Sequence, residues 1–322
     1  MAKINSVTGP LDTRDLGRTL MHEHILICDW SVRIANKNWF DRDELVRMAV
    51  RELQLTKETG VKTIVDCTPI NLGRDVDILT EVADKSGMQI IASTGFYCQE
   101  EPWMIGKPES ELVRVMVDDI EKGMQGKAVK AGIIKVATDD TLGLTENNIR
   151  VLKAAAKAHL ETGVPITTHS NAKQKTGLLQ QDIFEEAGVN LKNVVIGHVG
   201  DSNDIGFLEE VLGRGSFIGM DRFGDNNFNP LRKRIDTLVK MIKRGHESHI
   251  ILSQDSDVFI DFGANTWEIK RKKTPENRTP EERDLRYIDR LVLPELRKSD
   301  VTEAQINKVL EDNPRRVFEQ GN

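Results

Sequence analysis

The feature that most constrains the fold is the alternation of short apolar segments with longer amphipathic segments along the whole chain. The apolar segments are nearly continuous runs, which is typical of parallel strands that helices cover on both faces. The segments between them have helical spacing and are long enough to cross back over a sheet. Eight apolar segments can be counted, at residues 19–27, 61–67, 88–94, 131–137, 164–169, 193–199, 216–221 and 249–255.

Eight strand–helix units predict an α/β fold, a single (β/α)8 TIM barrel that spans residues 1–322 as one domain, because no linker interrupts the pattern. The turns before three strands contain Gly60, Gly87 and Gly163, where a left-handed residue commonly ends a helix. Residues 4–18 are rich in Gly, Pro and Asp and predict a short hairpin at the lower end of the barrel. The polar stretch 262–282 predicts an extended loop over the barrel mouth.

Composition excludes several classes of protein and favours an enzyme that acts on a small molecule. A net charge of −6 and a pI near 5.8 provide no positive field for nucleic acid. No run of 18 apolar residues predicts a membrane span, and the first residues lack the apolar core of a secretory signal. Three cysteines without C-x-x-C spacing argue against a disulfide framework and a structural zinc module. We therefore expect a cytoplasmic protein.

Candidate metal ligands stand at the ends of the predicted strands. His22 and His24 lie two residues apart, so both face the same side of the first strand. His169, His198 and Asp255 close the fifth, sixth and eighth apolar segments. Any one of them alone is as readily a polar residue where a strand meets a loop. Because parallel strand ends converge on one face of a barrel, the five together predict a metal site there.

Lys135 stands inside the fourth apolar segment, where a charged ammonium group is costly to bury. Burial favours the neutral amine, and a neutral amine can add carbon dioxide to form a carbamate. The two oxygens of that carbamate can bridge two cations, as a carboxylate does. The alternative is a lysine whose ammonium group extends to solvent at the strand end.

The set of H-x-H, strand lysine, two strand-end histidines and strand-end aspartate resembles the phosphotriesterase family of the amidohydrolase superfamily. The resemblance covers nearly the whole chain, from the Gly-Pro-Leu at residues 9–11 to the closing Asn-Pro-Arg-Arg-Val-Phe at residues 313–318. It implies a homodimer and two divalent metal ions, Zn, Co, Mn or Fe. In this assignment His22, His24 and Asp255 bind the buried ion, His169 and His198 bind the exposed ion, and N6-carboxylated Lys135 and a hydroxide bridge the two.

Two further residues resemble positions that mark the phosphotriesterase-like lactonases within that family. Tyr97 follows the third strand, and the resemblance assigns it to the ring oxygen or carbonyl of a lactone. Arg222 follows the seventh strand and is expected to order the mouth of the site. As isolated residues, a loop tyrosine and a paired arginine are more often structural. Asp255 is expected to carry a proton to the leaving oxygen, and Asp201 is expected to orient His198.

The leading hypothesis is a lactonase that opens N-acyl homoserine lactones and related lactones, as in quorum quenching, with promiscuous phosphotriesterase activity. Residues 256–259 are more polar than an acyl-chain channel should be, although Phe259, Phe262 and Trp267 are candidates for its apolar wall. The basic cluster at residues 270–273 favours an alternative, a phosphorylated sugar lactonase or a carboxyl esterase. An alternative of another class is a catalytically silent metal-binding protein.

Overall fold

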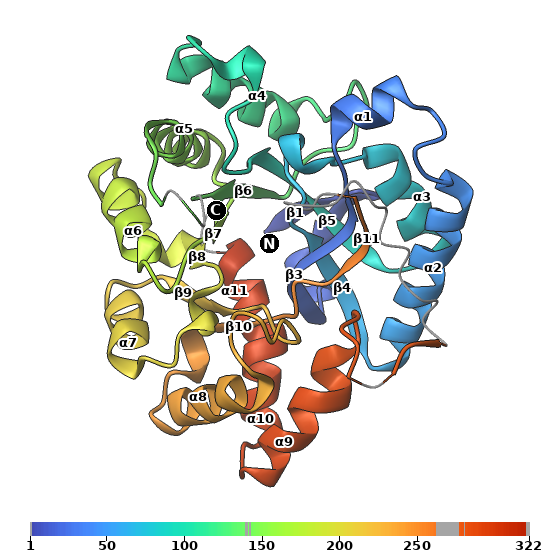
Figure 1. The fold of residues 1–322 in the computed structure, drawn as a ribbon. Coiled ribbons are helices and arrows are strands. Elements are labelled where there is room, and N and C mark those ends of the chain that lie inside the picture. Colours follow the sequence, from blue (N-terminus) through green and yellow to red (C-terminus); the bar gives the residue numbers. More distant parts are fainter. Residues whose placement is uncertain (1, 139–140, 142, 262–276, 280, 320–322) are drawn as a thin grey trace.

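The structure, a computed structural model, describes residues 2–138, 141, 143–261, 277–279 and 281–319. Within these residues, nine parallel strands form one curled sheet, and helices surround its outer face (Figure 1). The strands are β3 (Arg18–Ile27), β4 (Val61–Asp66), β5 (Gln89–Phe96), β6 (Ile133–Ala137), β7 (Ile166–His169), β8 (Val194–Ile196), β9 (Phe217–Met220), β10 (Ile250–Leu252) and β11 (Asp257–Ile260). This is the α/β barrel architecture that the alternation of segments predicts.

Polar caps and glycines set the ends of the surrounding helices. Asp41 accepts a hydrogen bond from the Glu44 amide at the start of α2, and Thr145 caps α5 in the same way. Gly87 and Gly163 have φ values of +65° and +74°, so the predicted left-handed helix ends are confirmed there. The helices are α1 (Trp30–Ala35), α2 (Arg42–Glu58), α3 (Val76–Ser86), α4 (Glu109–Glu121), α5 (Glu146–Thr162), α6 (Thr176–Glu186), α7 (Ile205–Gly213), α8 (Leu231–Lys243), α9 (Leu293–Lys298), α10 (Glu303–Asn307) and α11 (Asn313–Glu319).

All eight predicted apolar segments contain a strand of the sheet, in the predicted order. The eighth differs from its prediction, because β10 ends at Leu252 and the chain continues as the separate strand β11. Asp255 has a φ of +52°, and this left-handed residue interrupts the strand. The order of paired strands runs from β10 to β11, so β10 and β3 share no strand ladder. Residues 253–256 face β3 instead, and we call this boundary the seam.

Two apolar layers hold the barrel together. The larger lies between the sheet and the helices, and the smaller contains inward side chains of the strands, such as Val65, Ile91 and Val195. The antiparallel hairpin of β1 (Lys3–Ser6) and β2 (Gly9–Asp12) joins this inner layer through Ile4 and Leu11. The amide of Val7 donates to the carbonyl of Ile90 at 2.9 Å. The predicted hairpin is thus confirmed at the amino ends of the strands, opposite the strand ends that carry the candidate ligands.

Most of the predicted loop 262–282 lies outside the described residues, and so do Phe262, Trp267 and the basic cluster 270–273. In the part of the chain that the structure describes, no helix has both the length and the apolar character needed to cross a bilayer.

Candidate metal centre

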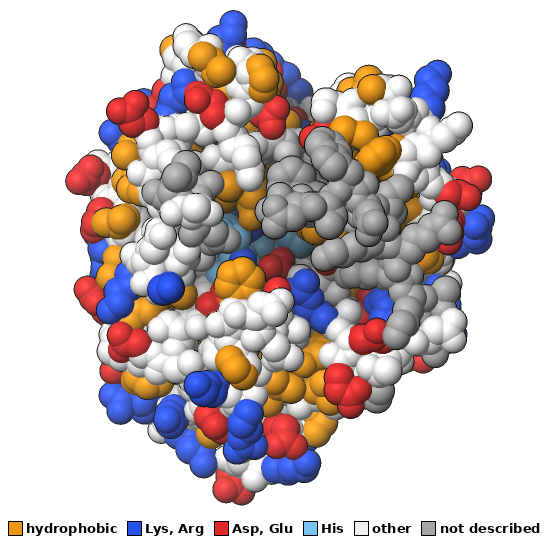
Figure 2. All heavy atoms as spheres, viewed as in Figure 1, with side chains coloured by type: hydrophobic (Ala, Val, Ile, Leu, Met, Phe, Trp, Pro, Cys, Tyr) orange, Lys and Arg blue, Asp and Glu red, His pale blue; other side chains and the backbone are white. Residues whose placement is uncertain are grey.

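The predicted ligands come together at the carboxyl ends of the strands, in one cavity of about 520 Å³. The histidine side chains are visible at the bottom of a hollow near the middle of this face (Figure 2). Tyr97 and Arg222 line the same cavity. The six candidate ligands among its lining residues are His22, His24, Lys135, His169, His198 and Asp255.

A bulge in β3 sets the direction of its two histidines. The pairing with β4 advances from Leu20 to Glu23 on β3 but only from Ile64 to Asp66 on β4, so β3 contains one extra residue. His22, within this bulge, and His24, past it, both line the cavity, and Glu23 between them is fully buried. The predicted common face of the two histidines is therefore observed.

Ligand atoms of residues far apart in sequence lie within contact distance. Nζ of Lys135 is 2.7 Å from Nε2 of His22, and Nε2 of His24 is 3.1 Å from Oδ1 of Asp255. Ligand atoms of His22, His198 and Asp255 all lie within 4.8 Å of one another, close enough to hold one cation. This group joins residues that the resemblance divides between two ions. The ring of His169 packs edge-on against that of His198, with centroids 4.5 Å apart.

Burial determines the protonation of this cluster. It lowers the pKa of His22 to about 4, with a further contribution from the charge of Lys135. Burial and the charge of Arg222 hold the pKa of His198 well below its ordinary value, and burial also lowers the pKa of Lys135. Burial alone raises the pKa of Asp255, but the His24 hydrogen bond and nearby positive charges outweigh it and hold this pKa well below its ordinary value.

The resulting donor set suits a divalent cation. Neutral imidazoles and an ionised carboxylate are ligands that Zn, Co, Mn and Fe accept. His198 and Asp255 both have left-handed backbones, with φ of +62° and +52°, a conformation that costs about 1–3 kcal/mol for residues other than glycine. Such strain collects at functional sites, because the surrounding structure must hold the residue in place. The residues present therefore fit the metal ions that the sequence implies.

Asp221 orients two of the candidate ligands. Its carboxylate accepts from Nδ1 of His22 at 3.1 Å and from Nδ1 of His198 at 2.9 Å. Burial raises the pKa of Asp221, but its interactions with His198 and His22, including the hydrogen bonds that both imidazoles donate, outweigh it and hold the pKa well below its ordinary value. A Cβ atom on Gly219 would lie 2.3 Å from the Asp221 carboxylate, so only glycine leaves room for this arrangement.

The prediction that Asp201 orients His198 is wrong. The Asp201 carboxylate instead accepts from Arg222 at 2.9 Å and from Arg234 at 2.6 Å. Sequence reasoning missed Asp221, although it closes the seventh apolar segment. The strand-end rule that found the ligands also applies to it.

Tyr97 and Arg222 both contact His169 at the rim of the cluster. The hydroxyl of Tyr97 lies 3.4 Å from Nδ1 of His169, and Nη2 of Arg222 lies 3.3 Å from the same atom. Nε of Arg222 donates to Oδ2 of Asp255 at 3.2 Å. The Arg222 guanidinium stacks on the ring of Phe228, 4.3 Å from its centroid. Arg222 thus connects a candidate ligand with the mouth of the cavity.

A second cavity of about 570 Å³ adjoins the first and shares Arg222 and Phe228 with it. Its other lining residues come from the loops after β7, β8 and β9. Most of them are polar, and they include Lys173. The site cavity has more apolar side chains in its wall, among them Ile27, Leu72 and Ile260.

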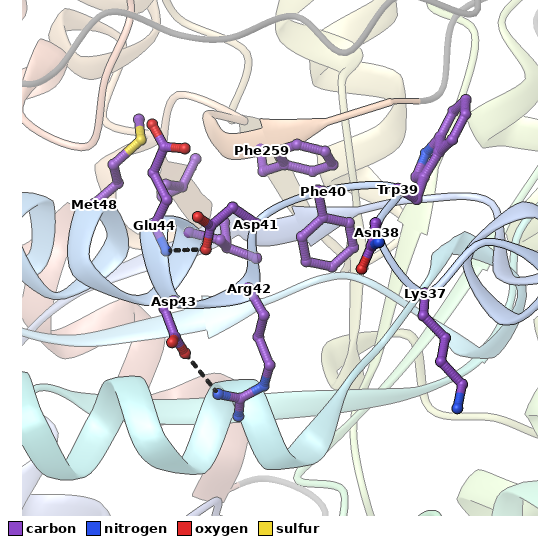
Figure 3. Close-up of a pocket in the computed structure, with 12 residues that line it drawn as sticks. Lys37, Asn38, Trp39, Phe40, Asp41, Arg42, Asp43, Glu44, Met48 and Phe259 are labelled. Atoms are coloured by element: carbon purple, nitrogen blue, oxygen red, sulfur yellow. Dashed lines mark hydrogen bonds and ion pairs between the residues drawn. The ribbon is translucent and has the colours of Figure 1, made fainter.

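A third cavity, of about 550 Å³, lies at the start of α2 and contains none of the candidate ligands (Figure 3). Phe259 lines this third cavity, where its ring packs against Phe40 with centroids 5.0 Å apart. Phe259 is not among the residues that line the site cavity, so the predicted place of Phe259 in the substrate wall is wrong.

Comparison with known proteins gives matches over nearly the whole chain. The model of the Phosphotriesterase family matches residues 2–318. The chain is 40% identical over 335 residues to the phosphotriesterase homology protein of Mycobacterium tuberculosis (strain ATCC 25618 / H37Rv), covering 99% of this chain and 98% of that one. It is 36% identical over 310 residues to the aryldialkylphosphatase of Saccharolobus solfataricus, covering 96% of each chain. The solved structure of the phosphotriesterase from Mycobacterium tuberculosis superposes with a TM-score of 0.89 at 39% identity, over 98% of both chains.

Proposed function

Because the chain belongs to the phosphotriesterase family of hydrolases, we propose that it is a metal-dependent lactonase with a weaker, promiscuous phosphotriesterase activity. Its substrates would be N-acyl homoserine lactones and related lactones. The observation that carries this proposal is the position of Tyr97 and Arg222 at the rim of the cluster, in contact with His169. We also propose a homodimer, from the family resemblance, and a cytoplasmic location, which three cysteines without a disulfide pattern favour.

Two divalent ions would be held by the six clustered side chains. Lys135 would contribute as the carbamate that its neutral amine forms with carbon dioxide, a reaction that makes an N–C bond and releases one proton. When bound, two such ions activate a water molecule at neutral pH and polarise the oxygen of the bond under attack. A planar ester carbon and a tetrahedral phosphorus are both open to such attack, so one site can support both activities.

Asp255 would move the proton during ring opening. It is ionised, and Arg222 and His24 each bind one of its two carboxylate oxygens. It can therefore accept a proton from the attacking water and pass it to the leaving oxygen of the opened ring. Tyr97 would donate its hydroxyl hydrogen to the ring oxygen or carbonyl and hold the lactone against the cluster.

A second candidate function is that of a phosphorylated sugar lactonase or a carboxyl esterase, whose substrate is a lactone or ester with a polar or anionic substituent. The polar cavity beside the site favours it, because a substituent that passes Phe228 would meet amides, hydroxyls and Lys173. The basic cluster at 270–273 lies outside the described residues, so Lys173 carries this argument. The remaining alternative, a silent metal-binding protein, is disfavoured because all six candidate ligands are present.

The test is turnover by purified protein loaded with zinc, cobalt, manganese or iron. The substrates are N-acyl homoserine lactones of increasing chain length, simple lactones, a phosphorylated lactone and paraoxon. We expect lactones to be hydrolysed faster than paraoxon. Inert lactones would reject the leading proposal, and a strong preference for the phosphorylated lactone would favour the second candidate. If every substrate is inert, the protein is catalytically silent, and elemental analysis far below two metals per chain would make it a scaffold on this fold.

A further inference from the structure

Glu23 stands between two candidate ligands on β3, yet it takes no part in the proposed chemistry. Its side chain is fully buried and does not line the site cavity. The carboxyl group, whose pKa burial raises well above its ordinary value, enters the seam and accepts three hydrogen bonds there. Oε1 accepts from the Ser253 hydroxyl at 2.5 Å and from the Gln254 amide at 3.1 Å, and Oε2 accepts from the Ser256 amide at 2.9 Å.

The seam has few backbone hydrogen bonds of its own. The amide of Asp255 donates to the carbonyl of His22 at 3.1 Å, and the amide of His24 donates to the carbonyl of Ser256 at 2.8 Å. The amide of His22 donates to the Ser253 hydroxyl at 3.1 Å. The Gln254 and Ser256 amides, on either side of left-handed Asp255, donate to Glu23 instead. Of these six hydrogen bonds across the seam, three therefore depend on one carboxylate.

We propose that Glu23 is a further positioning residue of the proposed metal centre, beside Asp221. It holds residues 253–256 against β3 and so fixes Asp255 in its left-handed conformation. That conformation places the Asp255 carboxylate against His24 at 3.1 Å and against Arg222 at 3.2 Å. The inference rests on the proposed function, because it gives Asp255 its place as ligand and proton carrier.

Glutamine is the informative replacement, because it keeps the volume of the side chain. Its amide group has one acceptor oxygen and one NH2 donor. Whichever way the glutamine amide turns, its NH2 group faces either the Ser256 amide or the Ser253 hydroxyl and the Gln254 amide. Glu23→Gln must therefore break at least one of the hydrogen bonds that flank Asp255. Glu52→Gln is the control, because Glu52 is also fully buried but bonds to the Leu285 amide and pairs with Arg278 at 2.9 Å, away from the cavity.

The experiment compares wild type, Glu23→Gln and Glu52→Gln after growth with added zinc. Metal per chain, the crystal structure around Asp255, and kcat and KM on the best lactone are measured. We expect Glu23→Gln to bind metal about 10- to 100-fold more weakly, to move Asp255 out of its left-handed conformation, and to lose kcat with KM little changed. Glu52→Gln is expected to lower Tm without changing Asp255 or the metal content.

Normal metal content and an unmoved Asp255 in Glu23→Gln would overturn the inference. If that variant does not fold, Ser253→Ala removes a single hydroxyl from the same network, and the same two readouts decide. Metal content and the position of Asp255 do not depend on turnover. Inert lactones would therefore reject the proposed function and leave the role of Glu23 to be judged separately.

Discussion

Two sides of the barrel hold candidate ligands in different ways. On one side, Lys135 and His169 belong to β6 and β7, which pair in regular parallel register, with Ala137 opposite His169. On the other side, at the seam, Asp255 lies at the break between β10 and β11, and His22 lies in the bulge of β3. Regular backbone pairing places the first pair. The second pair, Asp255 and His22, lies on irregular backbone that buried side chains must hold in place. We therefore expect its geometry to be the more sensitive to substitutions outside the cluster.

The largest expected effect is on the regular side, where the ligand itself carries the function. Lys135→Met removes the amine that we propose forms the carbamate, so we expect activity to fall to background and metal content to fall below two per chain. Because an apolar side chain replaces a buried amine, metal-free Lys135→Met is expected to be at least as stable as metal-free wild type. Turnover, elemental analysis and thermal unfolding check this. A large drop in Tm would show that Lys135 also supports the fold.

The seam side is expected to respond to acid in the metal-free protein. The pKa of His22 falls from 6.5 in the unfolded chain to about 4 in the fold, so the unfolded state binds more protons between these values. Stability from this group is present above pH 6.5 and is lost as the pH falls to 4, by about 3 kcal/mol. Urea unfolding across this range measures the slope. His22→Asn is expected to flatten it, and an unchanged slope would contradict the buried neutral imidazole.

Asp221→Asn tests the support that His22 and His198 share. An amide presents one acceptor oxygen in place of two, so at least one imidazole loses its partner, and we expect metal affinity to fall about 10- to 100-fold. The matched control on the regular side is Gln180→Leu. Gln180 is also fully buried and donates to the carbonyl of His169 at 2.8 Å. Metal titration should show a smaller effect for Gln180→Leu, and equal effects would remove the distinction between the two sides.

The smallest expected effect is that of Tyr97→Phe at the rim. Losing the hydroxyl that we propose binds substrate should lower kcat/KM on lactones about tenfold, which corresponds to one hydrogen bond of about 1.4 kcal/mol. Metal content should not change, because Tyr97 is not a candidate ligand. Steady-state kinetics on a lactone and on paraoxon check the substitution. A matching loss of metal would show that Tyr97 acts by supporting His169.

The sequence predicts the regular parts of the molecule better than the irregular ones. Apolar runs locate the strands. The strand-end rule brings five distant side chains into one cavity, and the cost of a buried charge singles out Lys135 as the sixth. The strand-end rule also applies to Asp221, but its pairing with His22, 199 residues away, depends on the register of the sheet and does not follow from the rule. The left-handed break at Asp255 has no apolar signature, which is why β11 was missed. Because Phe259 belongs to β11, the strand that follows this break, its position outside the site cavity could not be predicted either.

The central claim is that the six clustered side chains hold two metal ions, with Lys135 carboxylated. A crystal structure of protein grown with zinc or cobalt, with anomalous data at the metal edge, tests it most directly. We predict two anomalous peaks in the cavity and density for a carbamate on Lys135 between them. An unmodified amine and no peak in the cavity would contradict the account.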